Sequence, residues 1–425
     1  MAMTLAERML ADRAGLPEVQ PGQLVEVPLD LVMGNDITAP IAIEAFEAAG
    51  ATEVFDRERI ALVASHFVPA RDISSADQVG IMRRFARQHG IRHYYPEGQG
   101  GIEHTLLPER GIVVPGDIVI GADSHTCTYG GIGAFATGVG STDLAYAMAT
   151  GRTWFKVPES MRIVYHGKRR RFVTGKDLIL HTIRRIGDDG ALYRAIEFTG
   201  DAIHDLPIED RLTMSNMTIE AGGKVGIAAV DDVTERYEEG RALRPWRRYA
   251  ADPGARYVEE LEVDVAALEP QVAFPSLPSL TRPISEVGDV AVDQVFIGSC
   301  TNGRLSDLRE AAAILRGRRV HPETRLIVIP ATQDVFMAAL REGLIEVFVA
   351  AGAAVAASTC GPCLGGHMGV LGKGERCLST SNRNYVGRMG DREAEVYLAG
   401  PAVAAATAVR GRITHPQEML PGGGD

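Results

Sequence analysis

The sequence has few cysteines for its length and no long apolar segment. Five cysteines in 425 residues are too few, and odd in number, for a disulfide framework. No apolar run reaches the roughly 18–20 residues of a membrane span. The N-terminal 15 residues form an amphipathic helical pattern without the apolar core of a signal peptide. We therefore expect a cytoplasmic protein that does not interact with a membrane.

An excess of positive charge is also absent. The chain has 44 Lys and Arg against 55 Asp and Glu, a net charge of −11, which argues against a surface for nucleic acid or acidic lipid. Apolar residues make up 45% and charged residues 23%, as is ordinary for globular proteins. The length allows two to four domains.

Short β-rich runs alternate with helical patterns along the chain. Residues 60–65 and 293–300 have the strand pattern, and residues 140–154 and 332–352 have the helical one. This alternation predicts an α/β architecture with mainly parallel sheets. Several strands end in turns rich in Gly, Ser, Cys and His, and ligands bind at the carboxyl ends of strands in such sheets.

Two seams divide the chain into three predicted α/β domains. One seam, at residues 155–158, separates a glycine-rich block from a basic strand. The other is the proline-rich segment 274–289, which we interpret as an inter-domain linker because proline fixes φ and removes a hydrogen-bond donor. The predicted domains are residues 1–156, 157–285 and 286–425, and the last of them carries the motif cysteines.

Three of the five cysteines follow predicted strands. Cys300 lies in VFIGSCTNG, and Cys360 and Cys363 lie in STCGPCLGGH. Glycines, and not a helix, follow the CGPC pair, which disfavours a thioredoxin-like redox centre. His367 could complete a zinc site with these thiols. Three thiolates also suit a [4Fe–4S] cluster with one iron left without a protein ligand, and burial without any ligand is a further alternative.

Several motifs together resemble the aconitase superfamily. They are GSCTN, CGPCLGGH, SNRNYVGR, GNDITAP, SHFVPARD, GIEHTLLPERG, GADSHTCTYGGIGAFATGVGSTD, EFTG and LTMSNMTIEAGGKVG. They extend over nearly the whole chain and are very specific in combination. The chain looks like the large subunit of a two-subunit member, of the 3-isopropylmalate dehydratase or homoaconitase type. It would hold three α/β domains around the cluster site, with the swivelling domain on a separate small subunit.

The resemblance implies a hydro-lyase that moves a hydroxyl between adjacent carbons of a 2-hydroxy di- or tricarboxylate by dehydration and rehydration. The [4Fe–4S] cluster would be held by Cys300, Cys360 and Cys363, and its open iron would act as a Lewis acid. The small subunit, in a heterodimer or heterotetramer, would supply a serine base and one more arginine. The favoured substrate is 3-isopropylmalate, of leucine biosynthesis, with homocitrate, homoaconitate, citrate, methylmalates and citraconate as alternatives.

The same resemblance implies roles for further residues. The positions that match substrate-binding residues are Asn35, Ser124, Arg383 and Arg388. Asn382 matches an asparagine that hydrogen-bonds to the cluster. The histidine–carboxylate pairs expected to move protons are His104 with Asp123 and His125 with Glu197.

One position departs from the family pattern. Ser65 precedes His66 where the family usually has an aspartate, and a hydroxyl cannot stabilise an imidazolium as a carboxylate does. Either His66 is a weaker acid, or another carboxylate such as Asp72 substitutes, or the substrate differs. A rival of another class, a cluster-free relative that binds nucleic acid, is disfavoured by the acidic balance and by the three cysteines.

Overall fold

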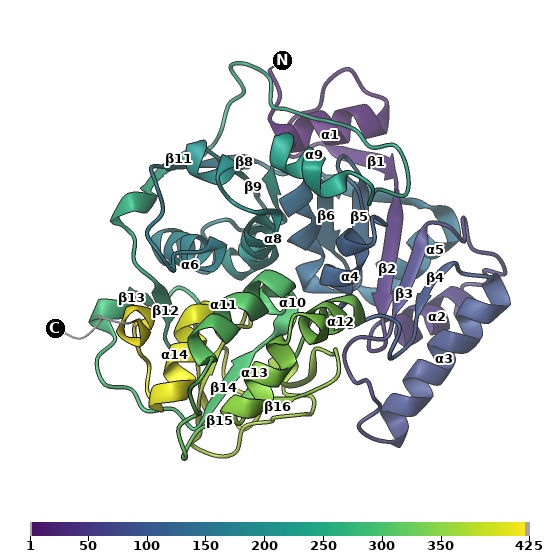
Figure 1. Cartoon of the computed structure of the whole chain (residues 1–425). Helices are drawn as coiled ribbons and strands as arrows, with labels where there is room; N and C mark the ends of the chain where they lie inside the picture. The colour runs from purple at the N-terminus through teal and green to yellow at the C-terminus, as the bar shows by residue number, and fades with distance from the viewer. Residues whose placement is uncertain (1, 421–425) are drawn as a thin grey trace.

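The computed structural model describes residues 2–420, so the predicted domain limits at residues 1 and 425 lie outside the described part. Three α/β units surround a common centre (Figure 1): a purple and blue unit, a teal unit, and a green and yellow unit. Within residues 2–420, no helix is both long enough and apolar enough to cross a bilayer.

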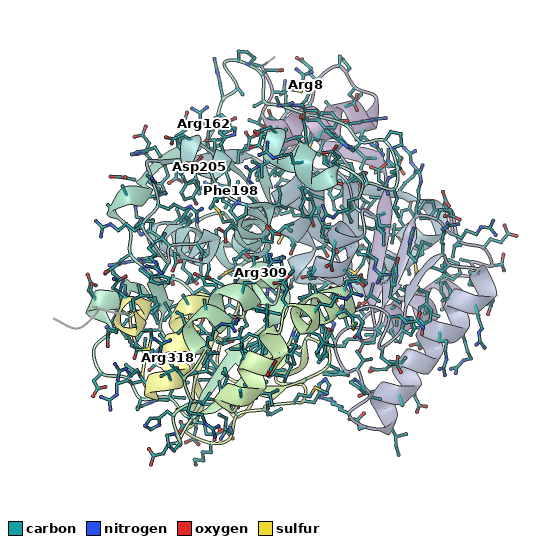
Figure 2. All side chains as sticks on the ribbon, in the orientation of Figure 1. Arg8, Arg162, Phe198, Asp205, Arg309 and Arg318 are labelled. Atoms are coloured by element: carbon teal, nitrogen blue, oxygen red, sulfur yellow. The ribbon has the colours of Figure 1, made fainter. Side chains whose placement is uncertain are left out.

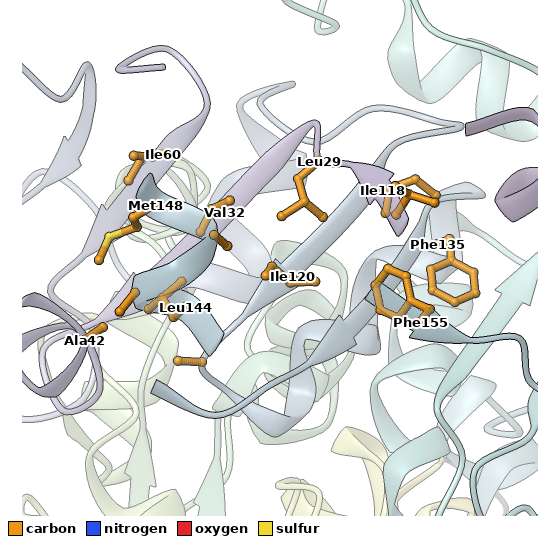
Figure 3. Packing of buried hydrophobic residues seen from close by; sticks show 14 of the residues in the cluster. Leu29, Val32, Ala42, Ile60, Ile118, Ile120, Phe135, Leu144, Met148 and Phe155 are labelled. Atoms are coloured by element: carbon orange, nitrogen blue, oxygen red, sulfur yellow. The ribbon is translucent and has the colours of Figure 1, made fainter. Parts of the chain in front are cut away.

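The first unit contains a parallel sheet of five strands in the order β4-β3-β2-β5-β6. Every residue of β3 and β5 is buried, as expected for a parallel sheet covered on both faces. Figure 3 shows Leu144 and Met148 of α5 in one core with Val32 and Ile120 of the sheet. The elements are α1 (Leu5–Ala14), β1 (Leu24–Pro28), β2 (Leu31–Asn35), α2 (Ala39–Ala48), β3 (Ile60–Val63), α3 (Ile73–His89), β4 (His93–Tyr95), α4 (Glu103–Glu109), β5 (Ile118–Gly121), the 3₁₀ helix η1 (Ser124–Ile132), β6 (Phe135–Gly138), α5 (Ser141–Thr150) and β7 (Arg152–Lys156).

The second unit contains a parallel sheet of four strands in the order β10-β9-β8-β11. In Figure 2, Phe198 of β9 lies inside this unit, whereas Arg162 of β8 lies towards its periphery. Arg8, on α1 of the first unit, lies at the periphery of the molecule. The antiparallel pair β1–β7 ends at Lys156, directly before this unit, where the sequence places its first seam. The elements are β8 (Ser160–His166), α6 (Gly175–Ile186), β9 (Ala195–Thr199), α7 (Asp201–His204), α8 (Ile208–Asn216), η2 (Met217–Ala221), β10 (Val225–Ala228), α9 (Asp232–Glu238), β11 (Glu259–Asp264) and η3 (Val265–Ala267).

The third unit contains a mixed sheet of seven strands in the order β13-β12-β18-β17-β14-β15-β16. The strands from β18 to β16 are parallel, and β12 and β13 are antiparallel additions at one edge. The elements are β12 (Gln271–Ala273), β13 (Thr281–Pro283), η4 (Ile284–Glu286), β14 (Gln294–Ile297), α10 (Ser299–Asn302), α11 (Leu305–Leu315), β15 (Arg325–Val328), α12 (Gln333–Arg341), α13 (Leu344–Ala351), β16 (Ala354–Val355), η5 (Gly361–Leu364), β17 (Arg376–Ser379), β18 (Glu395–Leu398), α14 (Pro401–Arg410) and η6 (Pro416–Met419).

The proline-rich segment 274–289 is not the linker that the sequence predicts. It begins directly after β12 and includes β13, and these two strands pair antiparallel at the edge of the third sheet. An edge strand tolerates proline because one of its sides forms no hydrogen bonds to a neighbouring strand. The change from the second to the third sheet therefore falls between Asp264 and Gln271, before the predicted boundary at residue 285.

The helical stretch at residues 332–352 is divided into two helices, α12 and α13. Gly343 lies between them with φ of 73°, in the left-handed region that glycine adopts without steric cost. The chain turns there, so both helices can cover the same sheet instead of running on as one rod.

Close backbone approach explains the glycine-rich sequence of η1. A Cβ atom on Gly130 would lie 1.8 Å from the carbonyl oxygen of Gly226 in β10, and one on Gly131 would lie 2.5 Å from the backbone nitrogen of Leu212 in α8. The two glycines thus let η1 of the first unit rest directly on the backbone of the second. This contact fixes the position of His125 at the start of η1.

A buried ion pair anchors α8, the helix on which η1 rests. The guanidinium of Arg211 donates two hydrogen bonds to Asp231, at 2.9 and 2.7 Å, and its side chain is almost fully buried. Burial alone would raise the pKa of Asp231, but hydrogen bonds from Arg211 and Thr234 lower it instead. The resulting stabilisation is present above the ordinary aspartate pKa and is lost as the pH falls through the depressed value.

We predict that Arg211→Met lowers the free energy of unfolding by about 3–5 kcal/mol, because the buried carboxylate of Asp231 loses its guanidinium partner and keeps only the contact with the ring of His204 among its charged neighbours. Urea unfolding followed by circular dichroism measures the loss. The matched control is Arg236→Met, which removes a solvent-exposed pair with Asp232 on α9 and should change stability little. Equal unfolding midpoints for the two variants would contradict the prediction.

Candidate active site

A polar cavity of about 180 Å³ lies where the carboxyl ends of strands from the first and third sheets meet. β2 ends at Asn35, and the turns after β3, β5, β14 and β17 also contribute. This is where the sequence predicts a ligand site. The residues that line it are Asn35, Ile37, Thr38, His66, His104, Asp123, Ser124, His125, Cys300, Cys360, Cys363, Leu364, Asn382, Arg383 and Arg388.

The three motif cysteines all reach this cavity. Cys300 lies on α10 directly after β14, and Cys360 and Cys363 lie at the start of η5 and within it. The hydroxyl oxygen of Ser299 is 3.7 Å from the sulfur of Cys300 and 3.5 Å from that of Cys363. Cys127 and Cys377 are also buried, but neither lines the cavity.

Amide groups point at the sulfur of Cys300. Asn216 Nδ2 and Asn382 Nδ2 donate to it at 3.1 and 3.3 Å, and Asn382 also donates to Asn216 Oδ1 at 3.0 Å. Burial raises the pKa of the Cys300 thiol to about 11. A thiolate there therefore needs these donors together with a bound metal group.

The arrangement of the thiols suits a polynuclear group better than a single zinc ion. A tetrahedral zinc with Zn–S bonds of about 2.3 Å would hold its sulfurs about 3.8 Å apart. In the described part of the chain, the three cysteines do not form a set whose sulfurs all lie within 4.8 Å of one another. His367 Nε2 lies 3.1 Å from the carbonyl oxygen of His66 and outside the cavity lining, so it does not supply a fourth ligand.

His104 and Asp123 form a close pair. Nε2 of His104 lies 2.9 Å from Asp123 Oδ1, and the other ring nitrogen lies 3.3 Å from the hydroxyl of Tyr129. Asp123 also accepts the backbone N–H of His125 at 2.8 Å. Burial would raise the pKa of Asp123, but the charge and hydrogen bond of His104, with hydrogen bonds from His125 and His66, lower it well below its usual value.

The carboxylate partner of His125 is Glu220, so the predicted pairing with Glu197 is wrong. His125 Nε2 lies 2.8 Å from Glu220 Oε1. The same carboxylate accepts a bifurcated hydrogen bond from the Nε–H of Arg383, at 2.7 and 2.9 Å to its two oxygens, and one hydrogen bond from the hydroxyl of Tyr385 at 3.0 Å. Burial favours the neutral acid, but His125 and Arg383 outweigh it and lower the pKa of Glu220.

Glu197 has a structural role elsewhere. It accepts the backbone N–H of Leu5 at 2.6 Å and the hydroxyl of Tyr257 at 2.8 Å, so it ties the N-terminal helix α1 to β9. Successive side chains of a strand point to opposite faces of the sheet, and Glu197 is on the face that does not reach the cavity. Burial raises its pKa.

Asp72 does not substitute for the carboxylate missing at Ser65. Its side chain is 49% exposed, and it caps α3 by accepting from the backbone and the hydroxyl of Ser75. Ser65 Oγ lies 2.8 Å from His66 Nδ1. The carboxylates nearest to the His66 ring are instead Asp36, Glu103 and Asp123, at 3.5 to 4.0 Å.

The four predicted substrate-binding residues differ in how free they are. Arg383 uses Nε for Glu220, and the residue lines the cavity. Arg388 Nε is buried without a partner in the described chain, and Ser124 lines the cavity. Asn35 is already engaged, since its amide donates to Glu103 and Asp123 and its oxygen accepts from the turn at Ile37 and Thr38. Asn35 therefore holds the carboxylates of Glu103 and Asp123 in position.

Sequence reasoning missed four residues of the site. Asn216 and Glu220 both lie in LTMSNMTIEAGGKVG, Glu103 lies in GIEHT, and Asp36 lies in GNDIT. Each is a polar residue inside a motif otherwise attributed to its neighbours. The motifs therefore contained these residues, but only the fold shows which polar side chains contact the residues that line the cavity.

Comparison with known proteins identifies the class of enzyme. The aconitase family (aconitate hydratase) model matches residues 12–411, and the chain belongs to this family. It is an iron–sulfur hydro-lyase, and the cofactor of the family is a [4Fe–4S] cluster.

Two curated relatives match almost end to end, and both are named 3-isopropylmalate dehydratase large subunit. The protein of Moorella thermoacetica is 62% identical over 420 residues, which cover 99% of this chain and 100% of the relative. That of Aquifex aeolicus is 58% identical over 425 residues, which cover 99% and 98%. A crystal structure of Thermococcus kodakaraensis aconitase X in its holo-form shares the fold, with a TM-score of 0.50, 14% identity and coverage of 91% and 92%.

We predict that Cys360→Ser lowers the iron and acid-labile sulfide bound by anaerobically purified protein, because the cluster loses one of its three thiolates. The matched control is Cys377→Ser, which alters a buried cysteine outside the cavity and should keep the metal content. Colorimetric iron and sulfide assays provide the measurement. Full loading of the Cys360 variant would show that its sulfur is not a ligand.

We predict that Glu220→Gln lowers turnover of the assembled enzyme about 100-fold or more, because it removes the charge that orients both His125 and Arg383. Glu197→Gln is the control, since Glu197 is a buried glutamate of the same unit without a contact to the site. Steady-state assays give kcat, and thermal unfolding checks that both variants are folded. A larger loss of kcat in Glu197→Gln than in Glu220→Gln would support the pairing of His125 with Glu197 instead.

Proposed function

We propose that the chain is the cluster-binding large subunit of a 3-isopropylmalate dehydratase, a hydro-lyase of leucine biosynthesis. One observation carries the proposal: a single cavity brings together three thiols, two guanidinium groups and two histidine–carboxylate pairs. The names of the curated relatives support the choice of substrate.

The substrate would be held by its charges and by its alkyl group. Arg383 and Arg388 offer guanidinium groups, which suit carboxylates because their donors form a planar fork. Apart from the cysteines, the apolar side chains of the cavity are Ile37 and Leu364. Two apolar side chains together with two cations match a malate that carries an isopropyl group.

The cluster would be held by Cys300, Cys360 and Cys363, with Asn216 and Asn382 as hydrogen-bond donors to the first of them. When bound, it supplies an iron with an open position, a Lewis acid that polarises the substrate hydroxyl and weakens its C–O bond.

The histidines would hold the proton that the leaving hydroxyl takes up and would transfer it to the hydroxyl oxygen. We assign its donation to His66, whose side chain is 12% exposed towards the cavity, against 3% for His104 and 7% for His125. In dehydration the C–H proton leaves to a base and its electron pair forms the double bond. The C–O bond breaks, and the oxygen takes the proton of His66 and departs as water. Addition of water with the opposite orientation completes the isomerisation.

A second chain would complete the site. The relatives are named large subunits, which supports a separate small subunit. We propose that this partner brings the base for the C–H proton and a further arginine, in a heterodimer or heterotetramer.

The test compares substrates with the anaerobically assembled complex. We expect kcat/KM to be at least about tenfold higher for 3-isopropylmalate than for homocitrate or citrate, because a missing alkyl contact costs about 1–3 kcal/mol. The chain alone should show almost no turnover. A preference for a tricarboxylate would reassign the substrate, and robust turnover without the small subunit would refute the two-chain site.

A further inference from the structure

Glu103 is a fully buried carboxylate that the chemistry described so far does not use. It is the first residue of α4, and its exposed fraction is 0%. Its Oε1 atom accepts a hydrogen bond from Asn35 Nδ2 at 3.1 Å. Its Oε2 atom is buried and has no hydrogen-bond partner among residues 2–420. Burying such a group is costly unless a positive charge balances it.

Two imidazoles flank this carboxylate. Oε1 of Glu103 lies 3.8 Å from His66 Nδ1 and 3.7 Å from His104 Nε2. His104 already has Asp123 at 2.9 Å, whereas the closest partner of His66 Nδ1 is the neutral hydroxyl of Ser65 at 2.8 Å. On its Nδ1 side, His66 therefore has no carboxylate in hydrogen-bond contact, and Glu103 at 3.8 Å and Asp36 at 4.0 Å are the acidic groups that face it there.

The other acidic groups that face His66 are committed elsewhere. Asp36 accepts the backbone N–H groups of Ser65, His66 and Phe67, each at 2.8 Å, so its charge holds this loop. Asp123 lies 3.5 Å from His66 Nε2, at the ring nitrogen other than Nδ1, and it also pairs with His104 at 2.9 Å. Cys360 is within 4.8 Å of both Glu103 and His66, and as a cluster ligand it shares its charge with iron.

We propose that Glu103 is the carboxylate partner of His66: it supplies the negative charge that Ser65 lacks and holds the ring in place for proton donation. This role rests on the proposed dehydratase function. Ser65 keeps the orienting hydrogen bond, and Glu103, reached from a different helix, provides the charge. The two residues together do the work of one carboxylate next to the histidine in sequence.

Relocating the carboxylate tests the proposal in the assembled, cluster-loaded complex. Glu103→Gln should lower kcat about 100-fold or more, within the usual range for general acid catalysis, with KM nearly unchanged because substrate contacts remain. Adding Ser65→Asp to this variant should raise kcat at least about tenfold, because a negative charge returns beside the His66 ring. Glu109→Gln on the same helix, where the carboxylate accepts from Thr332, should keep wild-type kcat.

A second readout does not depend on turnover. Diethyl pyrocarbonate modifies only neutral imidazole, and peptide mass spectrometry of the cluster-loaded chain reports the rate at each histidine. His66 should react severalfold faster in Glu103→Gln near neutral pH and return to the wild-type rate in the double variant. His125, paired with Glu220, is the internal control.

The outcomes separate the two claims. An unchanged His66 modification rate in Glu103→Gln, or a double variant with no more activity than Glu103→Gln, would overturn the role of Glu103. If the wild-type complex turned over none of the acids, the proposed function would fall. The modification rates would then still support or overturn the pairing of Glu103 with His66.

Discussion

A single carboxylate, Asp123, holds the histidines of the cavity in relation to one another. It lies 2.9 Å from the ring of His104, accepts the backbone N–H of His125, and lies 3.5 Å from the ring of His66. Asp123 follows β5 and caps η1, so the same residue that starts the helix also contacts all three histidines. The geometry of the site therefore depends on where this strand ends.

The second unit fixes the position of the third through two adjacent residues of α6. Lys176 is fully buried and donates to the carbonyl oxygens of Thr380 and Ser381, at 2.9 and 2.7 Å. Asp177 accepts the backbone N–H of Gln271 in β12 at 2.7 Å. Lys176 is 0% exposed, and this burial lowers its pKa to about 7. Residues 380–381 lead directly to Asn382 and Arg383, so the clamp positions both.

The alternation of strands and helices and the placement of the three cysteines after strands follow from local patterns in the sequence, and the resemblance to the aconitase superfamily implies most of the cavity lining. Sequence reasoning fails where the contact partner of a side chain or strand comes from another part of the chain. Glu197 and Glu220 are both acidic residues in family motifs. Only the fold shows that Glu220 contacts His125 and that Glu197 binds Leu5 and Tyr257 instead. Segment 274–289 contains linker-like prolines, yet edge strands accept them. Asp72 is near His66 in sequence, but it caps a helix instead.

The loop of His66 and the loop of the cysteines form one hydrogen-bonded unit. Cys360 donates its backbone N–H to the carbonyl oxygen of Ser65 at 2.8 Å, and the hydroxyl of Thr359 lies 3.1 Å from the carbonyl oxygens of both Ser65 and His66. One loop belongs to the first unit and the other to the third. Because these bonds join the backbones, binding of a metal group by Cys360 would also fix the position of His66. Cofactor binding and placement of the acid are thus set by the same contact between the two units.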